Sequence, residues 1–401
     1  MSKTRYDAYP YPERDPREET QRLLTGSPSS LYEIDHFVFG ARRDWSQPFQ
    51  VLVAGGGTGD GLIMLAQQLT DHAVPHEITY IDASRKSMQT ARDRAEIRSL
   101  ENITFLTGDF TQEMPDGAFD YIDCCGVLHH LPSPLSGLQK LASALTEGGG
   151  VGGMVYAPLG RTGVYPLQSA FGAMLADLPY PDQVAEARQI LAFLPKSNWL
   201  RRNPFVQDHK IGDAGLFDLL LHDQDQPFWS DEVISLVTRS GLDFAGFVHA
   251  IKYDPAYYLP ASKDHRTRSD ALKYPARARV AEELCGSMKN HIFYAVKGKP
   301  PEDPWNNSNA ILHLSGVPAA KIGDHITNGK AVSITLDDNK YARTLAREIG
   351  SLIAICDGNT TLGEALMQSG LKELNSDARE DLAFLTDIGA LKASSLRAPS
   401  T

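Results

Sequence analysis

The fold of this chain is decided by the stretch Val51-Leu52-Val53-Ala54-Gly55-Gly56-Gly57-Thr58-Gly59-Asp60. Its first four residues form a short apolar run, which predicts a buried parallel strand. The glycines that follow allow a sharp turn and a close approach of the backbone to a ligand, because no Cβ atom is in the way. Residues 62–69 predict a helix, whose free N–H groups and positive dipole end would point at that ligand.

Three nucleotide-binding motifs begin in this way, and spacing excludes two of them. The dinucleotide fingerprint requires Gly or Ala three places after its second glycine, where this chain has Asp60 in one frame and Leu62 in the other. The phosphate-cradling loop ends in Gly-Lys-Ser/Thr, and residues 51–69 contain no lysine. The motif that remains is Gly-x-Gly-x-Gly, here Gly55, Gly57 and Gly59. The alternative is that these glycines form a structural turn that binds no ligand.

Length and composition limit the classes of protein to which this chain can belong. A chain of 401 residues predicts two or three domains, and 42% hydrophobic with 22% charged residues is typical of globular proteins. The net charge of −11 argues against non-specific binding to nucleic acid or anionic membranes. The spacing of the four cysteines fits neither a zinc site nor a disulfide framework, and no metal is expected. With no apolar signal core and no membrane span, we expect a reduced, cytoplasmic protein.

Alternating strand and helix patterns predict a parallel α/β sheet. The expected strands cover residues 49–54, 78–82, 103–106, 119–131 (the fourth strand together with its exit), 151–157, 244–253 and 291–297. Asp82 ends the second strand about twenty residues after the glycines, where a carboxylate accepts hydrogen bonds from ribose hydroxyls. The alternative role of Asp82 is to cap the next helix.

The later strands carry a more specific signature. The third strand leads into Gly108-Asp109-Phe110, and the fourth runs from Phe119-Asp120 to Val127-Leu128-His129-His130-Leu131, before Gly148-Gly149-Gly150. Together with the glycine turn, these segments closely resemble the motifs of class I S-adenosylmethionine (SAM) methyltransferases. The resemblance implies a seven-stranded doubly wound sheet with the last strand antiparallel, and SAM as the cofactor.

The resemblance also implies the cofactor site. Asp109 is expected beside the adenine amino group, and Asp82 on the ribose. The full set of expected cofactor-binding residues is Tyr11, Gly55, Gly57, Gly59, Asp60, Asp82, Asp109, Phe110 and Cys124. The family has an acid near the end of strand one, where this chain has Val53. The contact of that acid with the glycine loop or the methionine end of SAM must then come from Asp60 or the N-terminal arm.

Methyl transfer from SAM is an in-line displacement that needs alignment more than a nucleophile on the enzyme. A base is required only if the acceptor begins protonated. The expected catalytic residues are His129, Tyr156 and Arg161, and the expected acceptor contacts are His130 and Tyr165. Structural packing is the alternative for both histidines, and for the vicinal pair Cys124 and Cys125.

Outside the sheet, residues 1–46 form an arm with three tyrosines, Tyr6, Tyr9 and Tyr11, which could close over the ligand as a lid or pack on a surface. Residues 47–299 are expected to form the methyltransferase domain, with a helical cap insertion at about 160–228.

A proline-rich linker, 300–304, precedes a small α+β unit at 305–401. In it we expect a strand pair of Ala310–His313 with Ala331–Ile334. Residues 356–366 resemble the winged-helix domains of the PqqD type, which implies docking of a peptide partner or a second copy. Because the sheet is complete before the linker, a chain ending near Lys299 is expected to stay folded and to bind SAM.

The sequence thus predicts a SAM-dependent methyltransferase acting on an O, N or S acceptor of a small molecule, peptide or protein. Three alternatives remain. The first is an inactive SAM-binding sensor or scaffold. The second, an RNA methyltransferase, is disfavoured by the acidic charge and the missing Asn/Asp-Pro-Pro-Tyr/Phe motif. The third, a nicotinamide oxidoreductase, is disfavoured by the failed fingerprint.

Overall fold

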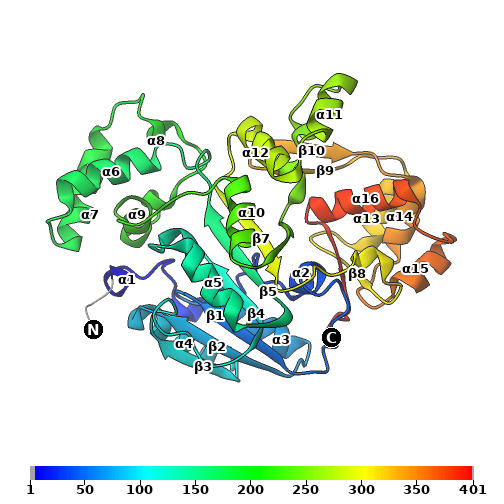
Figure 1. The fold of residues 1–401 in the computed structure, drawn as a ribbon, viewed down its shortest axis with the longest axis horizontal. Helices are drawn as coiled ribbons and strands as arrows, with labels where there is room; N and C mark the ends of the chain where they lie inside the picture. Colours follow the sequence, from blue (N-terminus) through cyan, green and yellow to red (C-terminus); the bar gives the residue numbers. More distant parts are fainter. Residues whose placement is uncertain (1–4, 400–401) are drawn as a thin grey trace.

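A computed structural model of the chain describes residues 5–399. Its centre is a seven-stranded sheet in the order β3-β2-β1-β4-β5-β7-β6 (Figure 1). The strands are β1 (Phe49–Ala54), β2 (His76–Asp82), β3 (Ile103–Thr107), β4 (Phe119–Cys125), β5 (Leu145–Tyr156), β6 (Asp243–Phe247) and β7 (Asn290–Val296). Strand β7 runs antiparallel to both β5 and β6, and the other neighbouring pairs are parallel. The predicted sheet, with its antiparallel last strand, is confirmed.

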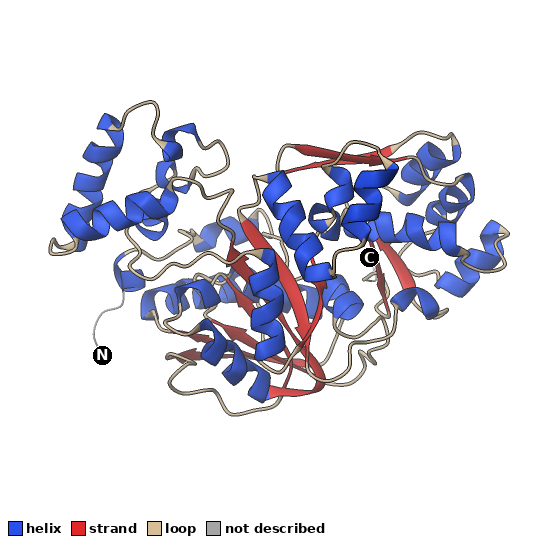
Figure 2. Cartoon of the chain, turned by 45° about the horizontal axis from the view of Figure 1, so that its top comes forward, coloured by secondary structure: helices blue, strands red, loops and turns tan. Residues whose placement is uncertain are grey.

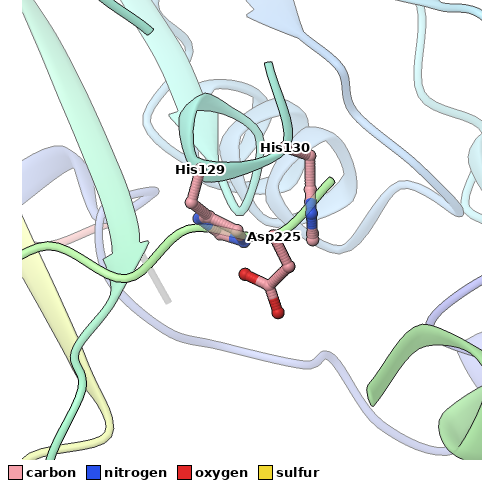
Figure 3. A group of neighbouring side chains, drawn as sticks. All are labelled: His129, His130 and Asp225. Atoms are coloured by element: carbon pink, nitrogen blue, oxygen red, sulfur yellow. The ribbon is translucent and has the colours of Figure 1, made fainter. Parts of the chain in front are cut away.

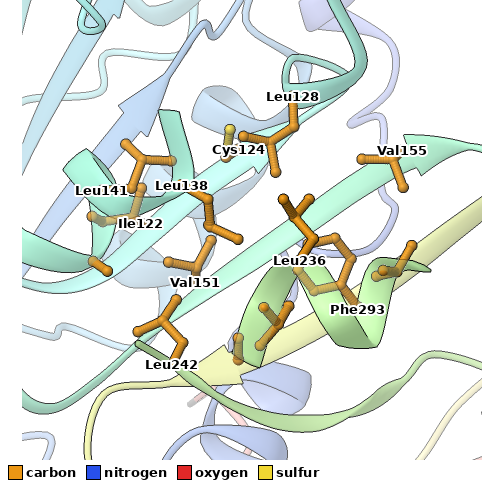
Figure 4. Packing of buried hydrophobic residues seen from close by; sticks show 14 of the residues in the cluster. Ile122, Cys124, Leu128, Leu138, Leu141, Val151, Val155, Leu236, Leu242 and Phe293 are labelled. Atoms are coloured by element: carbon orange, nitrogen blue, oxygen red, sulfur yellow. The ribbon is translucent and has the colours of Figure 1, made fainter. Parts of the chain in front are cut away.

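Helices cover both faces of this sheet (Figure 2). One face packs on α2 (Leu31–Phe37), α3 (Asp60–Asp71) and α4 (Arg85–Ile97). The other packs on α5 (Pro134–Ala144), α10 (Ser230–Arg239) and α12 (Tyr274–Cys285). Side chains alternate between the two faces along each strand. Figure 4 shows the result on the second face, where Ile122 and Cys124 of β4 meet Leu138 and Leu141 of α5.

Between β5 and β6 the chain forms the cap insertion, which Figure 1 shows as a helical lobe beside the sheet. Its helices are α6 (Val164–Leu175), α7 (Tyr180–Phe193), α8 (Trp199–Arg202) and α9 (Asp213–Leu220), with the short turn η3 (Asp208–Lys210). This lobe has its own apolar cluster, in which Phe171 and Phe217 are buried. Ahead of the sheet, the arm contains α1 (Arg5–Ala8) and η1 (Pro16–Thr20).

The sixth strand is shorter than predicted. Strand β6 ends at Phe247, whereas the apolar pattern predicted a strand to Tyr253. The backbone of His249 adopts a left-handed conformation (φ 55°), which a strand cannot continue through. The chain then forms the turns η4 (Ala250–Tyr253) and η5 (Pro255–Tyr257) and the helix α11 (Lys263–Asp270) before α12. Elsewhere in the chain, the short turn η2 (Leu128–His130) follows β4.

The strand pairing predicted for residues 305–401 is wrong. Strand β8 (Ile311–Leu314) pairs with β11 (Leu391–Ser394), and β9 (Val332–Leu336) forms a hairpin with β10 (Asn339–Arg343). The two residues of the hairpin turn, Asp337 and Asp338, both have positive φ angles, as a tight two-residue hairpin turn requires. The segment that was expected to pair with β8 lies largely in β9, which pairs with β10 instead.

The remaining elements of this unit are helical, apart from the turn η6. They are η6 (Pro304–Asn306), α13 (Ala319–Thr327), α14 (Arg347–Ala354), α15 (Leu362–Ser369) and α16 (Ser376–Asp387). The PqqD-like winged-helix resemblance gains no support from these pairings and stays a prediction. Across residues 5–399, no helix combines the length and apolar character needed to cross a membrane.

Buried contacts join this C-terminal unit to the N-terminal segment. Asp35 of α2 is fully buried and accepts hydrogen bonds from the Ser394 hydroxyl (2.7 Å) and the Ser395 backbone N–H (2.6 Å). Leu396 lies in the same apolar cluster as Leu31. The ring of Tyr32 stacks on His313 of β8, with centroids 3.8 Å apart. These contacts argue against the expected independence of residues 305–401.

Candidate cofactor and acceptor site

A cavity of about 900 Å³ opens at the carboxyl ends of the central strands, beside the glycine turn. Gly55 and Gly57 line it with φ angles of 71° and 53°, a conformation that side chains disfavour. A Cβ atom at Gly55 would lie 2.6 Å from the Val127 side chain, so the turn also fits closely against the exit of β4. The other walls are the arm and the cap insertion.

Asp82 stands at the end of β2 and faces this cavity. Its carboxylate accepts hydrogen bonds from the backbone N–H groups of Gly57 (2.9 Å) and Ser84 (2.7 Å). Burial raises the pKa of this carboxyl group. The capping residue of α4 is Ser84, whose hydroxyl accepts from the Ser87 N–H, so the alternative role of Asp82 as the helix cap is wrong.

Asp109 lies in the turn after β3 and also lines the cavity. It accepts hydrogen bonds from the backbone and hydroxyl of Thr111, at 2.8 and 2.7 Å. Because β3, β2 and β1 are consecutive neighbours in the sheet, Asp109, Asp82 and the glycine turn follow one another along one wall. An adenosine moiety laid along this wall would place its adenine near Asp109 and its ribose near Asp82.

Asp60, in the first turn of α3, is engaged by two guanidinium groups. Arg14 of the arm donates to both of its oxygens, at 2.9 and 2.6 Å, and Arg94 of α4 donates to Oδ1 at 2.7 Å. Burial raises the pKa of Asp60, but these two arginines hold it below its ordinary value. Arg94 is itself buried and paired with Glu19. Asp60 lines the cavity, yet its carboxylate fastens the arm.

The three arm tyrosines all contact the cap insertion. The Tyr11 hydroxyl donates to Asp208 (3.0 Å), and the Tyr6 hydroxyl donates to Asp218 (3.3 Å). The ring of Tyr9 stacks on that of Phe217, with centroids 5.0 Å apart. Tyr6 and Tyr11 line the cavity. The arm therefore spans the cavity from α3 to the cap, a geometry that a lid requires, and the lid role stays a prediction.

The cap side of the cavity is acidic and aromatic. Asp218 of α9 is only 4% exposed, and burial raises the pKa of its carboxyl group to about 7. The Tyr6 hydroxyl lies 3.0 Å from Nε2 of His222, so one hydroxyl bridges Asp218 and His222. Arg161 lies 3.5 Å above the centre of the Tyr156 ring.

Beside this wall, His129, His130 and Asp225 form the one cluster in the described part of the chain with metal-ligand geometry, their ligand atoms all within 4.8 Å (Figure 3). His130 and Asp225 are already engaged: Nδ1 of His130 lies 2.9 Å from the Gln224 carbonyl, and Asp225 pairs with Arg161 at 3.2 Å. A bound dication would sit close to this guanidinium group, which would repel it. The cluster is therefore a poor fit for a metal ion.

The structure brings most of the predicted site residues to the cavity wall. They are Tyr11, Gly55, Gly57, Asp60, Asp82, Asp109, Phe110, His130, Tyr156 and Arg161. Gly59 does not line the cavity: a Cβ atom there would lie 2.9 Å from that of Ala91, so it serves the packing of α3 on α4.

Three other predicted residues also lie away from the cavity. Cys124 belongs to the opposite face of β4, packed in the core of Figure 4, whereas Cys125 lines the cavity. His129 is buried behind Tyr156, and desolvation lowers its pKa well below the usual value, which weakens the base prediction. Tyr165 accepts a hydrogen bond from Arg161 Nε (3.1 Å), and of these two residues Arg161 lines the cavity.

Sequence reasoning missed many residues of the wall, and four of them matter for its chemistry: Asp123, Asp208, Asp218 and His222. Two of them had a readable signal. Asp123 interrupts the run Tyr121-Ile122-Asp123-Cys124-Cys125, and Asp218 interrupts the apolar run Leu216-Phe217-Asp218-Leu219-Leu220. A carboxylate inside an apolar run is costly to bury and therefore indicates function. Asp208 and His222 lie in irregular cap segments without such a pattern.

Comparisons with known proteins agree with this geometry. Residues 52–151 match the model of the methyltransferase domain family. An uncharacterised protein of Synechococcus sp. is 29% identical over 386 residues, which is 91% of this chain and 88% of that protein.

Among solved structures, the fold is similar to that of PKMT2 from Rickettsia typhi (TM-score 0.60, 14% identity), over 92% of this chain and 75% of that one. PKMT2 in complex with AdoHcy gives a TM-score of 0.59 at 15% identity, over 94% and 76% of the two chains. The methyltransferase family model matches residues from β1 to β5, including the glycine turn. The order of the strands in the sheet is that of the methyltransferase fold. The chain therefore carries a class I SAM-dependent methyltransferase domain.

Proposed function

We propose that this methyltransferase transfers its methyl group to an amine. The observation that carries the proposal is the acidic wall on the cap side, where Asp208 and Asp218 face the cavity with the arm tyrosines bonded to them. An amine arrives as an ammonium ion, which carboxylates attract. A carboxylate or phosphate acceptor would be repelled by the same wall.

The aromatic residues of the wall fit the same acceptor. Tyr6, Tyr11, Tyr156 and Tyr180 line the cavity. Tyrosine rings attract cations through the electron density of their faces, and this attraction strengthens where water is excluded. Two cations of the wall, Arg14 and Arg161, are paired with Asp60 and Asp225, so they do not cancel the charge of the other two carboxylates. The third, Lys289, is exposed.

Asp218 is suited to remove the proton that an ammonium acceptor must lose before its lone pair can attack the methyl carbon. A general base works best when its pKa is close to the operating pH, and burial raises that of Asp218 to about 7. The groups that act on it are Arg161, which lowers its pKa, and Asp225 and Asp208, which raise it; the Tyr6 hydroxyl also lowers it. We therefore expect the transfer rate to rise with pH through about 7, as this carboxylate ionises.

The test is a panel of acceptors incubated with isotopically labelled SAM. We expect methylation of a primary amine, either free or as a lysine side chain in a peptide, and none of matched carboxylates, phenols or thiols. Asp218→Asn should lower kcat about 100- to 10,000-fold, the usual contribution of a general base. Asp223→Asn is the matched control, because Asp223 lines the same cavity with a side chain that is 66% exposed. Transfer to a phenol or thiol, with none to amines, would refute the proposal.

A further inference from the structure

The carboxylate of Asp123 lies on the cavity wall without a function in the site described so far. Asp123 of β4 is paired in register with Val53 of β1, and both line the cavity. Residues paired in this way on parallel strands direct their side chains to the same face. A Cβ atom at Gly61, in the first turn of α3, would lie 3.2 Å from the Asp123 carboxylate. Asp123 thus places a carboxylate beside position 53, where an acid was expected and Val53 stands.

The bonding of Asp123 differs from that of the other carboxylates near the glycine turn. Asp60 is paired with two arginines, and Asp82 accepts from two backbone N–H groups. Asp123 is 2% exposed and accepts a hydrogen bond from the Ser29 hydroxyl at 2.6 Å. Within residues 5–399 it forms no ion pair. A buried carboxylate without a cation is costly, and a ligand cation at this wall would offset that cost.

The order of the strands indicates which part of the cofactor reaches Asp123. Asp109 and Asp82 follow β3 and β2, where the adenosine is expected, and β4 lies on the other side of β1. The amino-acid part of SAM extends from the sulfur away from adenosine, and therefore towards β4. This amino-acid part of SAM carries an α-ammonium group.

We propose that Asp123 binds this α-ammonium group, in the place of the acid that β1 lacks. The inference rests on the SAM site and is independent of the acceptor. Asp123 holds the amino-acid part of the cofactor, and so helps to fix the sulfur in line with the acceptor. It does not touch the methyl group.

The experiment is calorimetry on the full chain with two ligands, S-adenosylhomocysteine and 5′-methylthioadenosine, which lacks the amino-acid part. Asp123→Asn should weaken S-adenosylhomocysteine roughly 10- to 100-fold, as expected for the loss of a hydrogen bond between charged groups. It should leave 5′-methylthioadenosine unchanged. Asp82→Asn is the control, because a ribose contact should weaken both ligands alike. Thermal melts report whether each variant is folded.

A second variant moves the carboxylate back to β1. In the Asp123→Asn background, Val53→Asp should restore part of the affinity for S-adenosylhomocysteine, because the two positions face the same way. Equal weakening of both ligands by Asp123→Asn, or no weakening of either, would overturn the inference. These measurements need no acceptor, so failure of the amine proposal leaves them unaffected. A wild-type chain that binds neither ligand would overturn the cofactor site itself.

Discussion

Arg14→Gln should speed the release of bound cofactor while leaving the empty protein almost as stable as before. Arg14 is the charged contact that ties the arm to α3, through hydrogen bonds from its Nε and Nη2 to Asp60. A hydrogen bond to a charged group contributes about 1.5–3 kcal/mol when buried, and an exposed ion pair about 0.2–1 kcal/mol. The two side chains are 28% and 35% exposed, so we expect about 1 kcal/mol.

A loss of about 1 kcal/mol corresponds to roughly fivefold faster release if the arm must open first. Asp60 keeps its bond to Arg94 in the variant, so no buried charge is left unpaired. Release of S-adenosylhomocysteine is followed by stopped-flow displacement, and the melting temperature of the empty protein is measured in parallel. Arg17→Gln is the control, because Arg17 is 87% exposed and its one ion pair within residues 5–399 is with Asp15 of the same arm. Equal rates for wild type and Arg14→Gln would show that the arm does not gate release.

Four further outcomes are expected. Deleting residues 1–16 should accelerate release more than Arg14→Gln, because it also removes the tyrosine contacts with the cap; an unchanged off-rate would reduce the arm to packing. Asp82→Ala should weaken SAM by roughly 1.5–3 kcal/mol in calorimetry, and unchanged affinity in a folded variant would exclude the ribose contact. Gly57→Ala should weaken binding of SAM in the same assay. The alanine backbone would have to adopt a φ of 53°, and its Cβ atom would lie 3.2 Å from the Tyr11 carbonyl oxygen. Finally, a chain ending at Lys299 should aggregate or melt at a lower temperature on expression, in contrast to the expectation from sequence, and a stable monomer that binds SAM would show that the C-terminal contacts are dispensable.

The sheet could be predicted because its signals are local. An apolar run that ends in glycines, followed by strands with helical crossovers, leaves few alternatives to a parallel sheet, and the confirmed strands β1 to β5 are of this kind. The hairpin of β9 and β10 was missed because its turn is Asp337-Asp338, two residues that rarely adopt positive φ without an adjacent glycine.

The residues of the candidate site also fall into two groups, those that the sequence could place at the cavity and those that it could not. Asp82 and Asp109 could be placed because they end strands, and strand ends lie at the edge where ligands bind. Asp218 carries a signal of function in its apolar run, but it could not be placed at the cavity, because it reaches the cavity through the fold of the cap, which no periodicity specifies. Cys124 was assigned to the wrong face because a shift of one residue along a strand reverses the direction of the side chain.

The contact between α2 and β11 sets an order of events during synthesis. Asp35 emerges from the ribosome well before Ser394 and Ser395, the residues that bond its carboxylate, which lie 359 and 360 positions further along the chain. Pairings over such long sequence separations form late, because the intervening chain must first be brought together. Until then the segment that leads into the first strand of the sheet lacks its buried partners. We therefore expect the cofactor site to mature only after residues 394 and 395 have been translated, and a nascent chain paused before residue 390 to remain sensitive to proteolysis in its N-terminal segment.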